Sequence, residues 1–317
     1  MGFLCLLLAA LTLTAAQAQS YPTKPVRVIV AFSPGGVTDI IARTLMPKLS
    51  EMWGQPVVIE NRTGAGGTLG AMVVARAPAD GSVLLVHSSG YAINAAIQAA
   101  LPYDPRRDFV DVAPLGSQPQ VLVVNPASGL RSVRDVIARA KAKPGDLSYG
   151  SAGIGSGGHF NAEMFRIAAG IEVLHIPYKG GVDAINDTAA GRLDFTFNTL
   201  TLALPYIRDA RVVVLGVSSA KRTSLLPEVP TIAESGVPGF EFTFWNGLWA
   251  PAGTPAPIAE KIARDLAQVM GASDVRERFA RLGAEPMAMT PPEFSRFVRA
   301  EIENAERIAR ISGIKAQ

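Results

Sequence analysis

Residues 26–53 read VRVIVAFSPGGVTDIIARTLMPKLSEMW, and this stretch decides the fold class. The β-branched run VRVIVAF predicts a buried strand, and the apolar spacing from about Asp39 to Met52 predicts an amphipathic helix. Pro47 falls inside the helical pattern, so we expect it to kink or shorten the helix. A strand joined to a helix through a glycine-containing loop is the unit from which parallel α/β sheets are built.

The same alternation continues along the chain. Further strands are predicted at VVIE (57–60), SVLLVHS (82–88), VLVVN (121–125), LSYGSA (147–152), VLHIPY (173–178), LDFTFN (193–198), VVVLGVS (212–218) and FEFTFWNGLWAP (240–251). Helical segments are predicted near 68–77, 91–100, 133–143, 159–169, 182–190, 257–271, 275–282 and 291–310. Capping pairs, Ser132 with Asp135 and Thr290 with Glu293, mark two of the helix starts. The pattern predicts two α/β lobes.

The first 18 residues have the features of a secretory signal peptide. An apolar run from Phe3 to about Ala16 is followed by Ala16-Gln17-Ala18, a small-residue cleavage site, although the usual basic start is missing. The run is shorter than a bilayer span, so we expect cleavage near Ala18 and a periplasmic protein; a membrane anchor is the alternative. Cys5 is the only cysteine and lies in this segment, so the mature chain can form no disulfide.

The charge pattern argues against nucleic acid as a partner. The formal net charge is +3, and Lys and Arg occur in runs of at most two, unlike a nucleic-acid surface. A weak positive field of this kind attracts anionic solutes. The three histidines, His87, His159 and His175, show no metal-ligand spacing, so we expect neither a metal nor a cofactor.

Glycine-rich loops stand where predicted strands meet helices, the position at which open α/β sheets bind ligands. The first loop runs from Ser33 to Asp39 (SPGGVTD). Its glycines allow close approach of a ligand, and the free N–H groups at a helix start favour an anion. Asp39 has two interpretations, a cap of that helix or a direct ligand contact.

The second loop, Ser151–His159, reads SAGIGSGGH and satisfies the dinucleotide pattern GxGxxG. A nucleotide site would need an acid at the end of the next strand, but the nearest acid, Glu172, precedes VLHIPY. A carboxylate needs only the backbone donors. A third loop, Asn61–Gly67, is either a solute contact or a structural turn.

Signatures of catalysis are scarce. The nearest approach to a GxSxG elbow, Gly216–Ala220, lacks the last glycine. His87 and His175 lie in predicted strands, which favours buried imidazoles, whereas His159 starts a helix beside the second loop and is expected to face a cleft. The alternating aromatic residues of FEFTFWNGLW (240–249) favour core or interlobe packing over a stacking platform.

Taken in order, several stretches resemble the signatures of Bug-type receptors, the periplasmic solute-binding proteins of the tripartite tricarboxylate transporter class. They are PTKPVRVIVAFSPGGVTDIIAR, GQPVVIENRTGAGGTLGA, ADGSVLLV, LPYDPRRDF, LVVNP, HIPYKGG, AKRTSLLPEVPTIAESGVPGF and APAGTP, which together extend over nearly the whole mature chain. The resemblance implies an α/β fold like that of type II periplasmic binding proteins, with two lobes joined by crossing strands and a ligand cleft between them. It also implies a carboxylate ligand held largely by main-chain amides and ordered waters.

The resemblance further implies a set of ligand-binding residues. Transferred position by position, the set is Ser33, Pro34, Gly35, Gly36, Asp39, Ser88, Ser89, Asn94, Ser151, Gly155, Ser156, Gly157, His159, Asn198 and Thr199. Two positions depart from the family pattern. Ser33 replaces a usual proline or alanine, and Asn198–Thr201 replaces a usual Asp-Asn-Leu-Pro. Loss of the acid at Asn198 favours a plain or aromatic carboxylate over an amino acid.

We therefore expect residues 1–18 to form the signal peptide, 19–123 with 245–317 to form lobe 1, and 124–244 to form lobe 2. The expected function is capture of a di- or tricarboxylate, or an aromatic carboxylate, by a monomeric binding protein that is not an enzyme. Its expected partners are transporter subunits or a sensor. The rival hypothesis is a periplasmic α/β enzyme that uses His159 with Ser151 or Ser156.

Overall fold

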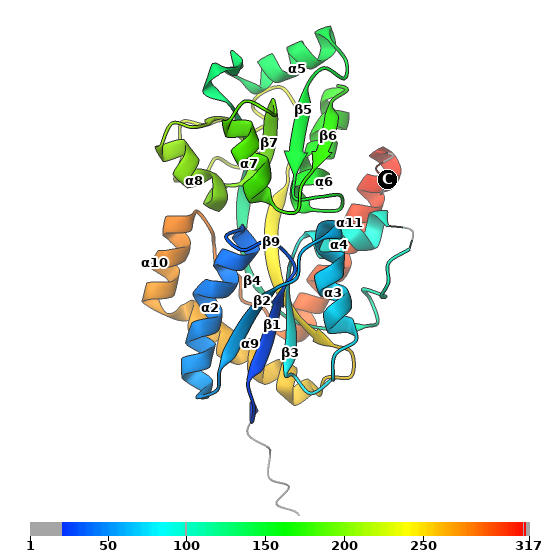
Figure 1. Cartoon of the computed structure of the whole chain (residues 1–317), viewed down its shortest axis with the longest axis vertical. Coiled ribbons are helices and arrows are strands. Elements are labelled where there is room, and N and C mark those ends of the chain that lie inside the picture. The colour runs from blue at the N-terminus through cyan, green and yellow to red at the C-terminus, as the bar shows by residue number, and fades with distance from the viewer. Residues whose placement is uncertain (1–20, 99, 313, 315–317) are drawn as a thin grey trace, which may run out of the picture.

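A computed structural model describes residues 21–98, 100–312 and 314. The expected signal peptide, its cleavage site and Cys5 lie outside the described residues. Figure 1 shows two α/β lobes along the long axis of the molecule, with strands β4 and β9 passing from one to the other. Among the helices of the described ranges, none combines the length and apolar character that a membrane span requires.

Lobe 1 is formed by both ends of the described chain. Strand β1 pairs in parallel with β2 and β3, and β9 lies antiparallel between β3 and β4. The elements are β1 (Val26–Val30), α2 (Val37–Trp53), β2 (Val57–Asn61), η1 (Ala65–Gly67), α3 (Thr68–Ala75), β3 (Val83–Ser88), α4 (Gly90–Ile97), β9 (Thr243–Pro251), α9 (Ala256–Gly271), α10 (Ser273–Leu282) and α11 (Pro291–Ser312).

Lobe 2 is inserted between these two parts. Strand β5 pairs in parallel with β6 and β7, and β4 is antiparallel to β7 and β8. Its elements are η2 (Pro126–Ser128), α5 (Val133–Ala142), β5 (Ser148–Ser151), α6 (Gly157–Ala169), β6 (Leu174–Pro177), α7 (Gly181–Ala189), β7 (Phe195–Thr199), α8 (Leu200–Arg208) and β8 (Val213–Val217).

Strand β4 (Phe109–Val124) belongs to both lobes. Its first part pairs with β9, and from Gln120 onward it pairs with β7 and β8. The backbone ladder therefore changes lobe between Pro119 and Gln120, and β9 makes the return crossing. These are the crossing strands that the resemblance implied. The lobe boundaries expected after residues 123 and 244 stay a prediction.

Both sheets are covered by helices on each face, which explains the continuous apolar strands. In β1, Val28 and Val30 pack in the cluster that includes α2 and α9, whereas Ile29 packs on the opposite face with residues of α3 and α11. A strand buried on both faces needs apolar residues at every position rather than at alternate ones. Lobe 2 repeats this plan with two apolar clusters of its own.

Most predicted elements form within a few residues of their expected bounds, and the exceptions have physical causes. Strand β4 is much longer than the predicted VLVVN. Its first part was not predicted, because Pro114, Gly116 and Pro119 are atypical of a strand; in the structure this part pairs with β9 through bulges. Helix α8 was not predicted, since Pro205 lies inside it. The expected shortening at Pro47 is wrong: α2 runs on to Trp53, with one face buried along its length.

Candidate ligand-binding site

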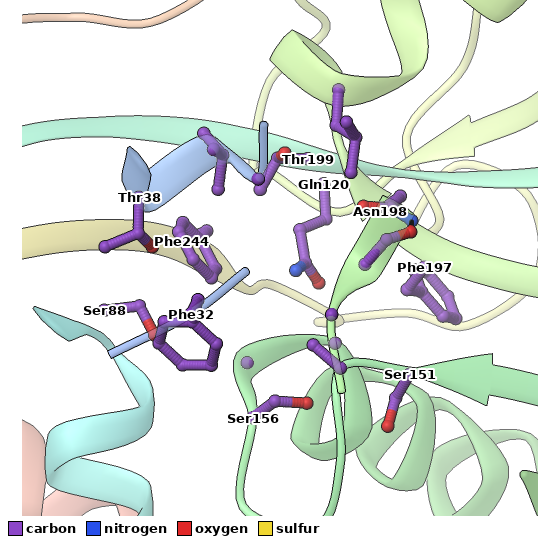
Figure 2. Close-up of a pocket in the computed structure, with 18 of the residues that line it drawn as sticks. Phe32, Thr38, Ser88, Gln120, Ser151, Ser156, Phe197, Asn198, Thr199 and Phe244 are labelled. Atoms are coloured by element: carbon purple, nitrogen blue, oxygen red, sulfur yellow. Dashed lines mark hydrogen bonds between the residues drawn. The ribbon is translucent and has the colours of Figure 1, made fainter. Parts of the chain in front are cut away.

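A narrow cavity of about 50 Å³ lies between the lobes beside the crossing strands. Figure 2 shows side chains entering it from several elements of both lobes. The lining that the structure describes is entirely uncharged. Its polar side chains are Ser33, Thr38, Ser88, Gln120, Ser151, Ser156, Asn198 and Thr199; its larger apolar ones are Phe32, Val37, Phe197, Leu202 and Phe244; its glycines are Gly36, Gly157, Gly158, Gly180 and Gly181.

Four helices begin at this cavity. Helix α2 starts there from lobe 1, and α6, α7 and α8 start there from lobe 2. The N-caps of α2 and α7, Gly36 and Gly180, have no side chain that could cap the helix, and within the described residues Thr199, the N-cap of α8, makes no side-chain capping hydrogen bond. Their first-turn N–H groups are thus open to an external acceptor, and the helix dipoles add positive potential at the same point. The cavity is built to hold an anion without a cationic side chain.

Helix α6 differs from the other three because its N-cap, Ser156, makes a side-chain capping hydrogen bond. Its Oγ accepts a hydrogen bond from the backbone N–H of His159 at 3.3 Å. Gly157 and Gly158 follow it in the lining, and a Cβ at Gly157 would lie 2.8 Å from the ring of Phe244. Only glycine leaves room for a ligand between this helix start and the aromatic wall.

Gln120 is a lining residue that the sequence interpretation missed. It is buried and lies where β4 passes from lobe 1 to lobe 2. Its Oε1 accepts a hydrogen bond from Asn161 Nδ2 at 2.7 Å, and its Nε2, on the cavity side, has no hydrogen-bond partner among the described residues. The available signal was the alternation of Gln118 and Gln120 directly before an apolar strand, since a buried amide needs a partner.

Ser151 is held from behind by a histidine. Its Oγ lies 2.7 Å from Nε2 of His175, and the backbone N–H of Gly153 donates to the same oxygen at 3.2 Å. Burial, together with the neighbouring His159, lowers the pKa of His175 to about 4, so the ring is neutral at neutral pH. The two imidazole centroids are 4.5 Å apart.

His159 supports the same loop but does not line the cavity. Its Nδ1 accepts from the N–H of Gly155 at 3.4 Å, and burial lowers its pKa to about 4. The pairing expected by the enzyme hypothesis, His159 with Ser151 or Ser156, is not the arrangement found. His175 takes the place beside Ser151, and in the described part of the chain no carboxylate hydrogen-bonds to His175 to complete a triad.

The structure brings part of the expected ligand set to the cavity and places the rest outside its lining. The residues at the cavity are Ser33, Gly36, Ser88, Ser151, Ser156, Gly157, Asn198 and Thr199. Those outside its lining are Pro34, Gly35, Asp39, Ser89, Asn94, Gly155 and His159. The aromatic segment is divided too, because Phe244 faces the cavity while Trp249 lies in the core of lobe 1.

Asp39 fixes the first loop. It is buried, and it accepts hydrogen bonds from the N–H of Gly35, from Arg43 and from Asn61 at 2.8 to 2.9 Å. Burial alone would raise the pKa of Asp39, but these donors together lower it. Its carboxylate therefore stays ionised with its acceptor sites occupied, which agrees with a structural role.

Asn94 and the third loop are structural as well. Asn94 Nδ2 donates to the carbonyl of Gly66 at 3.0 Å and its Oδ1 accepts from Gln98 at 2.6 Å. Gly66 packs so closely on Ile154 of the other lobe that a Cβ would fall 2.1 Å from its carbonyl oxygen. The third loop thus abuts the second loop across the mouth of the cleft.

The two lobes are closed on each other. Ser33 Oγ of lobe 1 donates to the carbonyl of Lys179 in lobe 2 at 3.2 Å, and Thr201 Oγ1 of lobe 2 donates to the carbonyl of Leu282 in lobe 1 at 2.7 Å. Together with the contact of Gly66 on Ile154, these bonds enclose the cavity on several sides. A ligand inside would contact both lobes at once.

Comparison with known proteins gives consistent matches over almost the whole chain. A family profile described as tripartite tricarboxylate transporter family receptor matches residues 41–314. The protein BugT of Bordetella pertussis is 36% identical over 300 residues, covering 94% of this chain and 92% of BugT.

Two solved structures share the fold closely. Rpa4515 of R. palustris, solved with adipate, is 36% identical with a TM-score of 0.90, covering 93% of this chain and 99% of that one. MatC of Rhodopseudomonas palustris, solved with bound malate, is 31% identical with a TM-score of 0.87, covering 91% and 99%.

Proposed function

This chain belongs to the tripartite tricarboxylate transporter family of receptors, the Bug-type solute-binding proteins, and we propose that the solute it captures is a compact aliphatic dicarboxylate. The observation that carries the proposal is an uncharged cavity onto which helix N-termini converge from both lobes. One carboxylate is held at the start of α2 and the other at the starts of α6 and α7. Each receives backbone N–H donors rather than a guanidinium.

The size of the cavity narrows the choice of ligand. One enclosed water needs about 10–15 Å³, so a cavity of about 50 Å³ has the room of only a few waters. That space suits a four-carbon diacid better than citrate or a benzoate ring. Related receptors bind malate and adipate, which are both dicarboxylates. The aromatic walls Phe32, Phe197 and Phe244 contact the aliphatic middle of the ligand.

The binding step is a closure of the lobes around the hinge formed by β4 and β9. An open form admits the ligand, and the closed form is stabilised because the carboxylates receive donors from both sides. The closed protein, exported to the periplasm after cleavage near Ala18 and acting as a monomer, delivers its ligand to membrane transporter subunits or to a sensor.

Calorimetry on protein that has been unfolded and refolded, so that any co-purified ligand is lost, tests this function. Malate and succinate are expected to bind more tightly than adipate, citrate or benzoate, and butyrate, with a single carboxylate, is expected to bind weakest. A ligand at 100 times its Kd raises stability by about 2.7 kcal/mol, which a thermal shift detects. Equal affinity for butyrate and succinate would contradict the two-carboxylate site.

The pair Ser151 and His175 supports one alternative, catalysis on a carboxylate substrate, because a hydroxyl 2.7 Å from an imidazole is the start of a nucleophilic site. That alternative expects a product to accumulate during long incubation with a bound ligand, and expects His175→Gln to abolish it. The receptor function expects the ligand to be recovered unchanged.

A further inference from the structure

A second cavity of about 470 Å³ lies on the opposite face of the crossing strands, and we call it the back cavity. Side chains alternate between the two faces of a strand. Phe244 of β9 points to the ligand cleft, whereas its neighbour Trp245 and the residue paired with it, Ser117, line the back cavity. The hinge strands thus separate the two cavities, and helices α4, α6 and α11 surround the back cavity (Figure 1).

Two aromatic pairs form walls of the back cavity. Phe160 and Phe242 have ring centroids 6.4 Å apart, and Trp245 and Phe297 have centroids 5.0 Å apart. Phe160 belongs to α6 of lobe 2, whereas Phe297 belongs to α11 of lobe 1. The cavity is therefore shaped by both lobes and offers several ring faces.

Two carboxylates are among the polar groups of this cavity. Glu301 Oε2 accepts a hydrogen bond from Trp245 Nε1 at 2.8 Å, and burial raises the pKa of Glu301. Ser89 is 3% exposed, and its Oγ has no hydrogen-bond partner among the residues that the structure describes. Glu241 adds a second carboxylate, and Arg307 is an exposed cation in the lining. A half-buried carboxylate in a cavity walled by aromatic rings is a recognition site for an ammonium group.

We propose that the back cavity binds an organic ammonium ion with an aromatic or branched apolar body. The ammonium group pairs with Glu301, and the apolar body lies between the rings of Phe160 and Phe297. The ligand is a small cation, whereas the cleft on the other face takes an anion.

Binding in the back cavity is coupled to the cleft by the position of the hinge. Rotation that opens the cleft brings α6 toward α4 and α11, because these helices lie on the far side of the hinge strands. Opening therefore narrows the back cavity, and an occupant favours the closed form. The coupling, which rests on the proposed capture of a dicarboxylate, is positive and reciprocal.

Phenethylamine is a suitable probe, with 2-phenylethanol as its uncharged counterpart. Titration of the full-length mature protein, read by calorimetry and by the NMR signal of the Trp245 indole N–H, is expected to give a Kd near or below about 1 mM for the amine. The alcohol is expected to bind at least about tenfold more weakly, since it cannot pair with a carboxylate. In the second arm, saturating amine is expected to tighten malate binding by about fivefold.

Glu301→Gln is the decisive variant, because the new amide oxygen still accepts from Trp245 while the charge is lost. This variant is expected to lose amine binding. When no amine is present, its malate affinity is expected to equal that of the parent protein. Glu303→Gln on the exposed face of α11 is the matched control and is expected to change neither. Equal binding of amine and alcohol, or amine binding retained in Glu301→Gln, overturns the site. Loss of malate binding in the parent protein overturns the proposed function but leaves the amine titration interpretable.

Discussion

The loops Ser33–Asp39 and Ser151–His159 face each other across the cleft, both rich in glycine and both leading into a helix, yet they are fixed by opposite chemistry. The lobe 1 loop is fixed by the ionised carboxylate of Asp39, which accepts hydrogen bonds from Gly35, Arg43 and Asn61. The lobe 2 loop is fixed by two neutral imidazoles, His159 and His175. Similar sequence patterns thus give loops that respond differently to substitution and to pH.

The largest expected effect comes from filling the lobe 2 loop. Gly157→Val places its Cβ within 3 Å of both Phe244 and Ser89, where no space is left. We expect malate affinity to fall by about 100-fold, equivalent to about 2.7 kcal/mol, while circular dichroism shows an intact fold. Gly36→Val in the lobe 1 loop meets only the carbonyl of Ser33 at 3.1 Å, so a loss of about tenfold is expected.

Arginine variants test whether a guanidinium side chain, and not the backbone N–H groups, binds the carboxylate of the ligand. Arg62 pairs with Glu60 and Arg222 with Glu234, and neither lines the cavity. Arg62→Ala and Arg222→Ala are expected to bind malate within about twofold of the parent, as for exposed ion pairs. If either eliminates binding while both valine variants bind normally, the anion site has been placed wrongly.

Gln120→Met tests the donor that belongs to the hinge rather than to either loop. The substitution keeps the volume but removes Nε2 from the cavity, and we expect about a tenfold loss of malate affinity, near 1.4 kcal/mol. Because it also removes the acceptor of Asn161, the free energy of unfolding must be measured in parallel by urea titration. Unchanged affinity would exclude Gln120 as a ligand contact.

Acidification is expected to weaken the lobe 2 loop selectively. Burial lowers the pKa of His159 and His175 from an ordinary 6.5 to about 4, so between these values the unfolded chain binds protons that the folded chain does not. Stability is complete above about pH 6.5 and is lost as the pH falls toward 4. The pKa of Asp39 is lowered below its ordinary value, so its contribution persists over this range.

Urea unfolding at several pH values between 7 and 4.5 measures this difference. Each titrating histidine contributes a slope of up to about 1.4 kcal/mol per pH unit. The double variant His159→Gln/His175→Gln is expected to show a shallower pH dependence than the parent. Burial also lowers the pKa of His87 to about 4. Because His87 is present in both proteins, its contribution to the pH dependence cancels in the comparison. Identical slopes would show that the imidazoles do not fix the loop.

A small effect is expected at the hydrogen bond by which the lobe 1 loop reaches lobe 2. Ser33→Ala removes the hydroxyl that donates to the carbonyl of Lys179, a partly exposed bond worth about 0.5–1 kcal/mol. We expect malate to dissociate about two- to threefold faster in stopped-flow measurements, with little change in association. A slower dissociation would mean that Ser33 hinders closure.

The fold class, two helix caps and the two glycine-rich loops of the cleft could be predicted from local sequence. The periodicities of residues 26–53 and of the later strand and helix pairs predicted the α/β class, because the spacing of apolar residues records which faces are buried. The capping pairs are present as expected: Ser132 Oγ accepts from the N–H of Asp135, and Glu293 Oε2 accepts from the N–H of Thr290. Glycine before a helix identified both loops of the cleft.

The tertiary structure decided which residues of those loops face the ligand and what surrounds them. The cavity is lined by residues from segments far apart in the chain, among them Phe32, Gln120, Gly180 and Phe244. No local sequence pattern predicts that these residues lie together. Asp39 and Asn94 lie outside its lining, and beside local partners each has one that is distant in sequence, Asn61 for Asp39 and Gly66 for Asn94. Local sequence determines secondary structure through burial periodicity and capping, whereas the side on which a polar residue finds its partner is fixed only when the lobes pack.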